Sequence, residues 1–316
     1  MAVTLAVSPG DTVPSMSWTV LGVPVDSVAA PAGGRPFGTE ESPAALRSLG
    51  VVDRLGAQDA GDLDVRITGP HRDEVSGIVG WPSVASAVTG VRTAVTSLLA
   101  ESRRPLLLGG CCTILMGAAP AARDALGRIG LAYIDGHVDL YDNRTSPTGE
   151  AADMPVAALL GRGWPDLLAT MGTVPVLNSE DIVIMGARDR EEAADIGDLP
   201  DRLGLTVHGP EVVKASPVSV GQAARDRFAS AGIPYWLHLD VDVLDEDVFP
   251  ATDYLMPDGL DLGQLARLMQ PLGRDPALIG ASVGCYNPQK DQDRQCGTAL
   301  AEVLADALGE VAKDGP

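Results

Sequence analysis

Cysteine is scarce in this sequence. Only Cys111, Cys112, Cys285 and Cys296 occur among its 316 residues. They are too few and too unevenly spaced for the disulfide framework that holds small secreted domains together. We therefore expect these four residues to be free thiols or metal ligands in a reducing compartment.

Positive charge is also in short supply. The chain has 23 Lys and Arg against 43 Asp and Glu, which gives a formal net charge of −20, and it shows no local basic patch. Such a chain repels nucleic-acid phosphates and anionic lipids, so we expect neither nucleic acid nor a membrane as a partner. The acidity favours solubility, and it would also draw a cationic small-molecule substrate toward a cleft lined with carboxylates.

Long apolar runs are absent as well. No run reaches the roughly 18 residues that a bilayer span needs, and residues 1–13 have no basic region before an apolar core. We therefore expect a cytoplasmic protein. Because the chain has no internal repeat and no Pro/Ser-rich linker, we also expect a single domain over residues 1–316, with flexible ends at about 1–16 and 313–316.

The apolar residues, 45% of the chain, fall into two alternating patterns. Short apolar runs bounded by Gly, Pro or Asp predict strands at 18–23, 105–108, 130–134, 181–185, 235–243 and 279–283. Ala- and Leu-rich stretches with helical spacing predict helices at 83–100, 113–126, 218–231, 262–271 and 298–312. Strands that alternate with helices form parallel crossovers, which predicts an α/β fold with a mainly parallel sheet covered on both faces. Pro- and Gly-rich segments at 29–38 and 143–155 follow strands, where open sheets place their ligand loops.

The first cluster of candidate site residues is Asp135, His137 and Asp139, at the end of an apolar strand. Unpaired carboxylates are costly to bury at a strand end. A divalent cation removes that cost, and this ligand set suits Mn, Fe, Ni or Zn. The alternative is a polar loop that caps the next helix.

The second cluster lies on the strand predicted at 235–243. Alternation along a strand places His238, Asp240 and Asp242 on one face and the neighbouring Leu and Val residues on the other. Without a cation the two carboxylates would repel each other. Two such clusters in one chain favour a shared metal site.

A third candidate is the turn after the strand at 105–108, where Cys111 and Cys112 follow two glycines. A thiolate there is a candidate metal ligand, and a helix N-terminus would lower its pKa. Two alternatives are an inert buried thiol and thiol redox chemistry, either a vicinal disulfide or a redox sensor. The turn lacks the Gly-Lys-Ser/Thr of a phosphate loop, and the chain has no G-x-S-x-G motif.

The order of these motifs resembles the ureohydrolase family, which includes arginase, agmatinase and formiminoglutamase. Gly109-Gly110-Cys111-Cys112-Thr113 lies where that family has G-G-D-H-S, and Asp135-Gly136-His137-Val138-Asp139 is similar to D-A-H-x-D. Further on, residues 148–155 are similar to S-G-N-x-H-G-x-P, residues 186–189 to G-x-R-D, and residues 240–245 to D-x-D-x-x-D-P. Weaker matches are residues 22–24 with 38–47, and Asp59-Ala60-Gly61-Asp62. The resemblance covers nearly the whole chain.

The resemblance implies a three-layer α/β/α sandwich, assembly as homo-trimers or hexamers, and two divalent ions, most often manganese, that activate a hydroxide. Carried over position by position, five of the family's six ligands are Asp135, His137, Asp139, Asp240 and Asp242. The sixth, a histidine in the family, falls on Cys112. A thiolate is softer than an imidazole and would favour Zn or Fe over Mn.

Three further positions depart from the family pattern. Cys111 replaces an aspartate that supports the site, Ala152 replaces a loop histidine that is a proposed proton shuttle, and Cys285 replaces a glutamate that pairs with guanidinium. These departures resemble ureohydrolase-like enzymes of natural-product pathways, including one that acts on an N-hydroxylated arginine.

The function that follows is a metal-dependent hydrolase of a linear C–N bond in a guanidino, hydroxyguanidino, amidine or formimino compound. The candidate catalytic residues are Asp135, His137, His238, Glu150 and Asp153, the last three as proton carriers. The candidate substrate contacts are Glu150, Asp153, Asp189 and Cys285. The alternative is a catalytically inactive paralogue with a binding or regulatory role.

Overall fold

The computed structural model describes residues 17–27, 38–69, 71–189 and 197–309. Within them, eight strands form one sheet in the order β2-β1-β3-β8-β7-β4-β5-β6, and every neighbouring pair is parallel. The strands are β1 (Trp18–Val23), β2 (Gln58–Asp62), β3 (Arg104–Gly109), β4 (Gly130–Ile134), β5 (Ile182–Met185), β6 (Thr206–His208), β7 (Tyr235–Asp240) and β8 (Leu278–Gly284). The ends expected to be flexible, 1–16 and 313–316, lie outside the described residues, as does most of the loop at 29–38.

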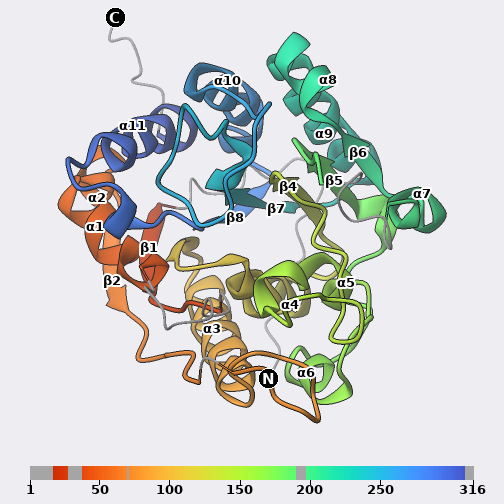
Figure 1. Ribbon diagram of the computed structural model, residues 1–316. Helices are drawn as coiled ribbons and strands as arrows, with labels where there is room; N and C mark the ends of the chain where they lie inside the picture. Colours follow the sequence, from red (N-terminus) through yellow and green to blue (C-terminus); the bar gives the residue numbers. More distant parts are fainter. Residues whose placement is uncertain (1–16, 28–37, 70, 190–196, 310–316) are drawn as a thin grey trace, which may run out of the picture.

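Helices cover both faces of this sheet, and Figure 1 shows the two groups on opposite sides of the strands. One group is α3 (Ser83–Ala100), α4 (Leu115–Leu126), α5 (Pro155–Leu159), α6 (Pro165–Thr170) and α7 (Leu199–Leu203). The other is α1 (Ser42–Ser48), α2 (Val51–Arg54), α8 (Pro210–Ala215), α9 (Pro217–Ala231), α10 (Leu262–Gly273) and α11 (Gln295–Leu308). The predicted three-layer α/β/α fold with a parallel sheet is confirmed.

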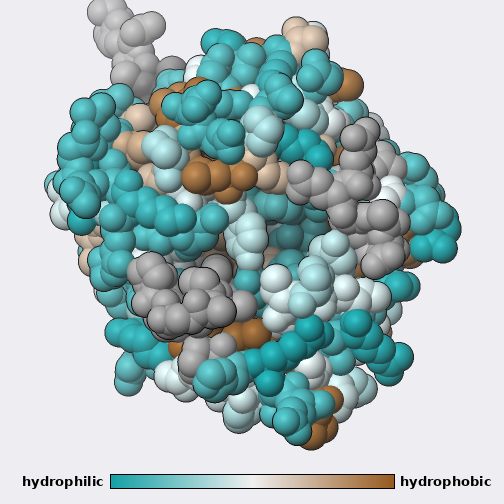
Figure 2. Space-filling view, in the orientation of Figure 1, coloured by the Kyte–Doolittle hydropathy of each residue, from teal (hydrophilic) through white to brown (hydrophobic). Residues whose placement is uncertain are grey.

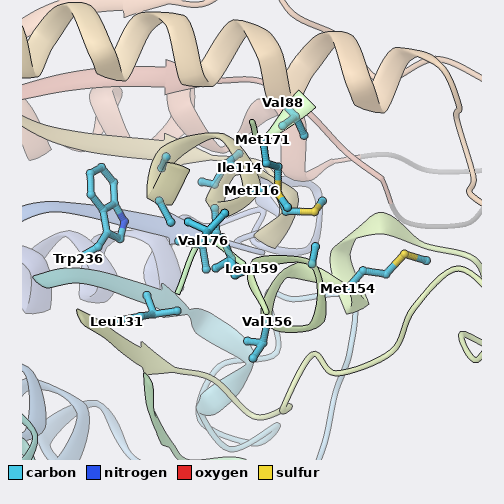
Figure 3. Packing of buried hydrophobic residues seen from close by; sticks show 14 of the residues in the cluster. Val88, Ile114, Met116, Leu131, Met154, Val156, Leu159, Met171, Val176 and Trp236 are labelled. Atoms are coloured by element: carbon cyan, nitrogen blue, oxygen red, sulfur yellow. The ribbon is translucent and has the colours of Figure 1, made fainter. Parts of the chain in front are cut away.

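Each central strand divides its side chains between two hydrophobic cores. In β4, Leu131 and Tyr133 pack into the core under α3 and α4, whereas Ala132 and Ile134 pack into the core on the opposite face. This division follows from the period of two along a strand. Figure 3 shows the first core, where Leu131 faces the side chains that α3 and α4 contribute.

Helix α3 is long and apolar enough, by length and composition alone, to cross a membrane. Its residues Val84, Val88, Val91 and Val95 are buried in the first core. Arg92 on the same helix pairs with Asp124, which lies on α4. The apolar composition of α3 is therefore accounted for by its packing against the sheet.

The sequence located most elements, with specific errors at their ends. The strand predicted at 235–243 ends at Asp240, and the helix predicted to 312 ends at Leu308, before Gly309. The edge strands β2 and β6 were missed because β2 is exposed along its whole length and β6 has three residues, so neither shows a buried apolar run.

Candidate metal centre

Two neighbouring strands deliver the carboxylates of the site. β4 and β7 pair in parallel with Ile134 opposite Leu239, so the residues that follow them emerge at the same edge of the sheet. Asp135 follows β4 directly and Asp240 is the last residue of β7. Both side chains are almost fully buried. The two candidate ligand motifs therefore meet, as expected at the carboxyl ends of adjacent parallel strands.

The imidazole of His137 joins this cluster. Its Nδ1 atom lies 3.1 Å from Asp242 Oδ2 and 3.5 Å from Asp135 Oδ1. The backbone N–H of Gly136 donates to Asp242 Oδ1 over 3.1 Å, and the backbone N–H of His137 donates to Asp135 Oδ1 over 2.7 Å. The donor atoms of these three side chains lie within 4.8 Å of one another, which is compatible with one shared cation.

The position of Asp242 corrects one expectation. We predicted that His238, Asp240 and Asp242 share one face of a strand, but residues Val241–Val243 form a 3-10 turn after β7. The Asp240 side chain caps this turn by accepting a 2.8 Å hydrogen bond from the Asp242 backbone N–H. The turn, rather than strand alternation, aims the Asp242 carboxylate at His137.

Asp139 lies beside the cluster and is held by a tyrosine. The Tyr133 hydroxyl donates a short hydrogen bond to Asp139 Oδ2, and the Asp139 backbone has a φ of 48°, which is uncommon for a residue other than glycine. Asp139 belongs to none of the described groups whose donor atoms lie within 4.8 Å of one another. Asp139 is therefore less closely grouped with the other candidate ligands than Asp135 and Asp240 are.

Cys112 reaches the cluster from the turn after β3. Its sulfur lies 2.7 Å from Asp240 Oδ2 and 3.9 Å from Asp135 Oδ2. The turn depends on Gly110, because a Cβ there would lie 1.4 Å from the carbonyl oxygen of Val25. The structure therefore brings Cys112 to the carboxylates, where the family resemblance places the sixth ligand.

Cys111 points into a different environment. Its sulfur lies 3.1 Å from Ser27 Oγ and 3.3 Å from Thr113 Oγ1, and burial together with the charge of Asp26 raises its pKa to about 11. All four cysteines are free thiols in the structure. The geometry thus gives the Cys111–Cys112 disulfide interpretation no support.

Burial and mutual repulsion dominate the electrostatics of the cluster. Desolvation, followed by the charges of Asp240 and Asp242, holds the pKa of Asp135 well above its usual range. Desolvation also raises the pKa of Asp139, with the charge of Asp135 adding to the effect. Asp242 differs: burial raises its pKa, but the charge and hydrogen bond of His137, together with the Gly136 backbone N–H and the charge of Arg188, leave the pKa lowered.

This arrangement fits a bound metal. Among the described residues, His137 is the one cationic side chain paired with the candidate carboxylate ligands, and the four buried acids Asp135, Asp139, Asp240 and Asp242 need more positive charge than one imidazole supplies. Carboxylate, imidazole and thiolate donors together form a ligand set for divalent transition metals. Asp135, His137, Asp139, Asp240, Asp242 and Cys112 would hold the ions.

A cavity of about 250 Å³ opens over the cluster. Its described lining includes the candidate ligands His137, Asp139, Asp240 and Asp242, and the candidate contact residues Glu150, Asp153, Asp189 and Cys285. Figure 2 shows the molecule hollowed near the centre of one face, with hydrophilic residues and residues of intermediate hydropathy around part of the hollow. Within the described residues, no Lys or Arg lines the cavity.

Two carboxylates in the wall each have one oxygen without a hydrogen-bond partner among the described residues. Asp189 Oδ2 accepts a 3.2 Å hydrogen bond from the Val138 backbone N–H and Asp153 Oδ2 a 2.6 Å bond from Ser146 Oγ. The other oxygen of each is buried with no hydrogen-bond partner among the described residues. Burial raises the pKa of Asp189, and burial with the charge of Glu150 raises that of Asp153 to about 7. The wall is thus ready to accept N–H donors.

His238, a predicted proton carrier, lies behind the cavity rather than in its described wall. Its ring is fully buried, stacks on Tyr133, and contacts Ser282 Oγ through Nδ1 and the Cys112 sulfur through Nε2. Burial lowers the His238 pKa to about 3, so the ring is neutral. This placement fits a residue that hydrogen-bonds deeper in the fold, behind the candidate ligands, rather than a proton carrier in the cavity wall.

Sequence reasoning missed two tyrosines of the site. Tyr254 lines the cavity, donates a hydrogen bond to Glu150 Oε2 and meets the His137 ring edge-on at 5.9 Å. It lies in a long connection after β7 that carries no periodic signal. Tyr133 lies in the apolar run that predicts the strand at 130–134, and nothing within that run shows that its hydroxyl meets Asp139.

Comparison with known proteins gives consistent matches over most of the chain. A family model described as "Arginase family" matches residues 16–309. The arginase of Brevibacillus brevis is 27% identical over 301 residues, which cover 92% of this chain and 97% of that protein. The solved arginase structure from Bacillus caldovelox has a TM-score of 0.84 at 25% identity, covering 94% of this chain and 99% of that one. The proclavaminate amidino hydrolase of Streptomyces clavuligerus shares the fold, with a TM-score of 0.69 at 19% identity and coverage of 94% and 92%.

Proposed function

Because this chain belongs to the arginase family, we propose that it is a metal-dependent hydrolase of a linear C–N bond in a guanidino or amidino compound. The observation that supports this most is the convergence of Asp135, His137, Asp240 and Asp242 beneath a cavity whose walls carry further carboxylates. The matched relatives named above are described as arginases or as an amidino hydrolase.

The proposed ligands form two overlapping sets. Cys112, Asp135, Asp139 and Asp240 would hold one divalent ion, and Asp135, His137, Asp240 and Asp242 would hold the other. When bound, such a pair of ions supplies a Lewis acid and an activated water molecule for attack on the central carbon. Family membership favours manganese, whereas the sulfur of Cys112 favours zinc or iron.

The cavity wall supports a role for Asp153 and Glu150 in proton transfer. Hydrolysis adds water across the C–N bond, so the bond to the leaving nitrogen breaks and that nitrogen takes up a proton. Asp153 has a pKa of about 7, and a group that titrates near neutral pH both gives and takes a proton readily. Glu150 is buried beside it and receives the Tyr254 hydroxyl.

The charge of the cavity favours a substrate that offers N–H donors and no carboxylate near the wall. The unpaired oxygens of Asp153 and Asp189 accept hydrogen bonds from a cationic or amidino group. A substrate carboxylate would face Glu150 and Asp153 with no described Lys or Arg to receive it. Cys285 cannot supply the anionic partner that an ordinary guanidinium needs, so a less basic hydroxyguanidino, amidine or formimino group fits better.

A release screen tests this proposal. Metal-loaded protein is incubated with guanidino, hydroxyguanidino, amidine and formimino compounds, and urea, hydroxyurea and ammonia are measured beside the metal content. We expect release from at least one class, strictly dependent on bound metal. Equal inactivity toward all four classes, with metal bound, would remove the hydrolase proposal.

One observation favours a second function, a catalytically inactive binding protein. Ala152 lines the cavity at the position where the family resemblance places a proton-carrying histidine. Calorimetric binding of a guanidino compound without any turnover would identify this case. The retained acidic ligands weigh against it, since a bare buried acidic cluster destabilises the fold.

Family membership also leads us to propose a homo-oligomer, a trimer or a hexamer, in the cytoplasm. The exposed apolar side chains Val75, Val212 and Leu255 offer surface for such contacts. Light scattering on the purified chain measures the mass directly. A monomer at micromolar concentration would contradict the assembly.

A further inference from the structure

A second thiol, that of the cavity-lining Cys285, lies next to the thiol of Cys112. The sulfur of Cys285 lies 3.8 Å from that of Cys112, and both sulfurs and an Asp240 oxygen lie within 4.8 Å of one another. Two sulfurs that each lie ~2.3 Å from a tetrahedral zinc are about 3.8 Å apart. The two thiols therefore already have the separation of a pair of zinc ligands.

The fold holds this pair in place. Cys112 follows β3 and Cys285 follows β8, and these strands are neighbours with Leu108 opposite Val283. The Cys285 backbone N–H donates a 2.6 Å hydrogen bond to the carbonyl oxygen of Gly110, which ties the two turns together. Cys285 has a φ of 66°, a conformation that residues other than glycine adopt only where the surroundings enforce it.

A neutral imidazole approaches the same sulfur from the other side. His238 Nε2 lies 3.2 Å from Cys112 Sγ, and with Asp135 these donor atoms form a second group within 4.8 Å. The other ring nitrogen lies 2.7 Å from Ser282 Oγ, which fixes the ring beside the Cys112 sulfur. The two groups share only Cys112, so an ion between Cys112 and Cys285 has two sulfurs and a carboxylate within reach, and His238 positions the Cys112 sulfur.

We propose that the two metal positions of this chain are chemically unlike. One, where Cys285 joins the proposed ligands Cys112 and Asp240, is a sulfur-rich position that takes zinc. The other, at Asp135, His137 and Asp242 with the shared Asp240, has only oxygen and nitrogen donors and takes manganese. The inference rests on the proposed function, because it assigns the identity of ions that the function requires.

The physical reason is the match between ligand softness and metal. Thiolate ligands select zinc over manganese, whereas carboxylate and water ligands suit manganese. At position 285 the family resemblance places a glutamate that pairs with guanidinium. Cys285 cannot make that pair and serves as a metal ligand instead.

Cobalt titration tests the number of thiolates directly. Full-length protein is stripped by a chelator and titrated with Co²⁺, and the sulfur-to-cobalt charge-transfer band is followed in the near ultraviolet. We expect the band of Cys285→Ala at saturation to fall to about half that of the parent, and the band of the Cys112→Ala/Cys285→Ala double variant to vanish. Cys296→Ala is the matched control, since Cys296 lies outside both ligand groups, and its band should equal that of the parent.

His238→Ala gives a second, independent readout. The variant keeps both thiols, so its band at saturation should match that of the parent, while its Co²⁺ affinity falls by about 10- to 100-fold. Elemental analysis after loading with equal zinc and manganese should find one of each per chain in the parent. The double cysteine variant should lose the zinc and keep the manganese.

Four outcomes decide the inference. The expected bands and metal ratios support it. Bands of equal intensity in the parent and Cys285→Ala, or two manganese ions per chain, overturn it and leave the proposed metal-dependent function standing. A thiol count two short of four in the non-reduced parent shows a disulfide instead and also overturns it. A parent chain that binds no Co²⁺, Zn²⁺ or Mn²⁺ removes the proposed function together with the inference.

Discussion

The sulfur of Cys112 lies 2.7 Å from an oxygen of Asp240, although the two residues are 128 positions apart in the chain. One residue belongs to the turn after β3 and the other ends β7, with β8 lying between those strands in the sheet. Asp240 therefore connects the thiol to the carboxylate cluster. Substitutions of Cys112 and of Asp240 should therefore have different effects on the two metal positions. These two residues are the first targets for mutation.

Asp240→Ala should abolish metal binding. Asp240 is proposed to touch both ions, and of the two carboxylates shared by the ligand sets it lies closer to the Cys112 sulfur. Metal content per chain, measured by elemental analysis, should fall from two to none while the circular dichroism spectrum keeps its shape. The control is Asp226→Ala, an exposed aspartate on α9 that pairs with Arg225. Unchanged metal content in Asp240→Ala would refute the ligand assignment.

Cys112→His should keep two ions per chain and move their identity toward manganese. Histidine restores the nitrogen ligand that the family resemblance places at this position, and a nitrogen ligand is harder than a thiolate. Cys112→Ala should lose one ion and keep the other. The measurement is the zinc-to-manganese ratio after loading with both metals. If Cys112→Ala kept the parent's metal content, Cys112 would be a structural residue only.

Tyr133→Phe should weaken metal binding without unfolding the chain. The tyrosine hydroxyl orients Asp139, and loss of such an orienting contact lowers metal affinity by about 10- to 100-fold. Tyr235→Phe is a matched control, because that buried hydroxyl donates to the Leu272 carbonyl oxygen on the far side of the fold. Competition with a metallochromic chelator measures the metal affinity of both variants. Equal affinities in the two variants would show that Asp139 needs no such orientation.

Asp153→Asn should change how stability depends on pH. Burial raises the pKa of Asp153 from 3.8 to about 7, so between these values the folded chain holds a proton that the unfolded chain has released. Its contribution to stability is therefore largest below about pH 4 and declines as pH rises to about 7. The uncharged Asn variant lacks this decline.

Thermal unfolding of parent and variant across this range measures the effect. The gain in Tm of Asp153→Asn over the parent should be small near pH 4, grow toward pH 7 and stay constant above it. Both chains are compared at the same metal loading, because the ligands titrate as well. A constant difference at every pH would show that Asp153 keeps its ordinary pKa.

Substrate preference should follow the charge of the cavity. Arginine should be a poor substrate, because Cys285 offers no anion to its guanidinium and its carboxylate would meet Glu150 and Asp153. An N-hydroxylated guanidine should have a higher kcat/KM than the matching guanidine by about 10- to 100-fold, the equivalent of one charge-assisted hydrogen bond. Steady-state kinetics on matched pairs gives this ratio. Efficient turnover of arginine would contradict the argument.

Much of the fold was predictable from local patterns. The apolar runs located β1 and β4 to the residue, and helical spacing located α3 in the same way, because burial imposes a period of two on strands and of 3.6 on helices. The same patterns failed where burial is missing. β2 and β6 lie at the edges of the sheet, and no apolar run marks them.

The sequence by itself determined that two acidic motifs follow strands and that Cys112 stands where a ligand is expected, since these features lie within short stretches of chain. Only the tertiary structure decided that the sulfur of Cys285 lies 3.8 Å from that of Cys112, and that His238 faces this sulfur instead of the cavity. Both contacts join residues more than a hundred positions apart. They depend on the neighbouring places of β3, β8 and β7 in the sheet, and strand order follows from how whole elements pack, which no local pattern of residues encodes.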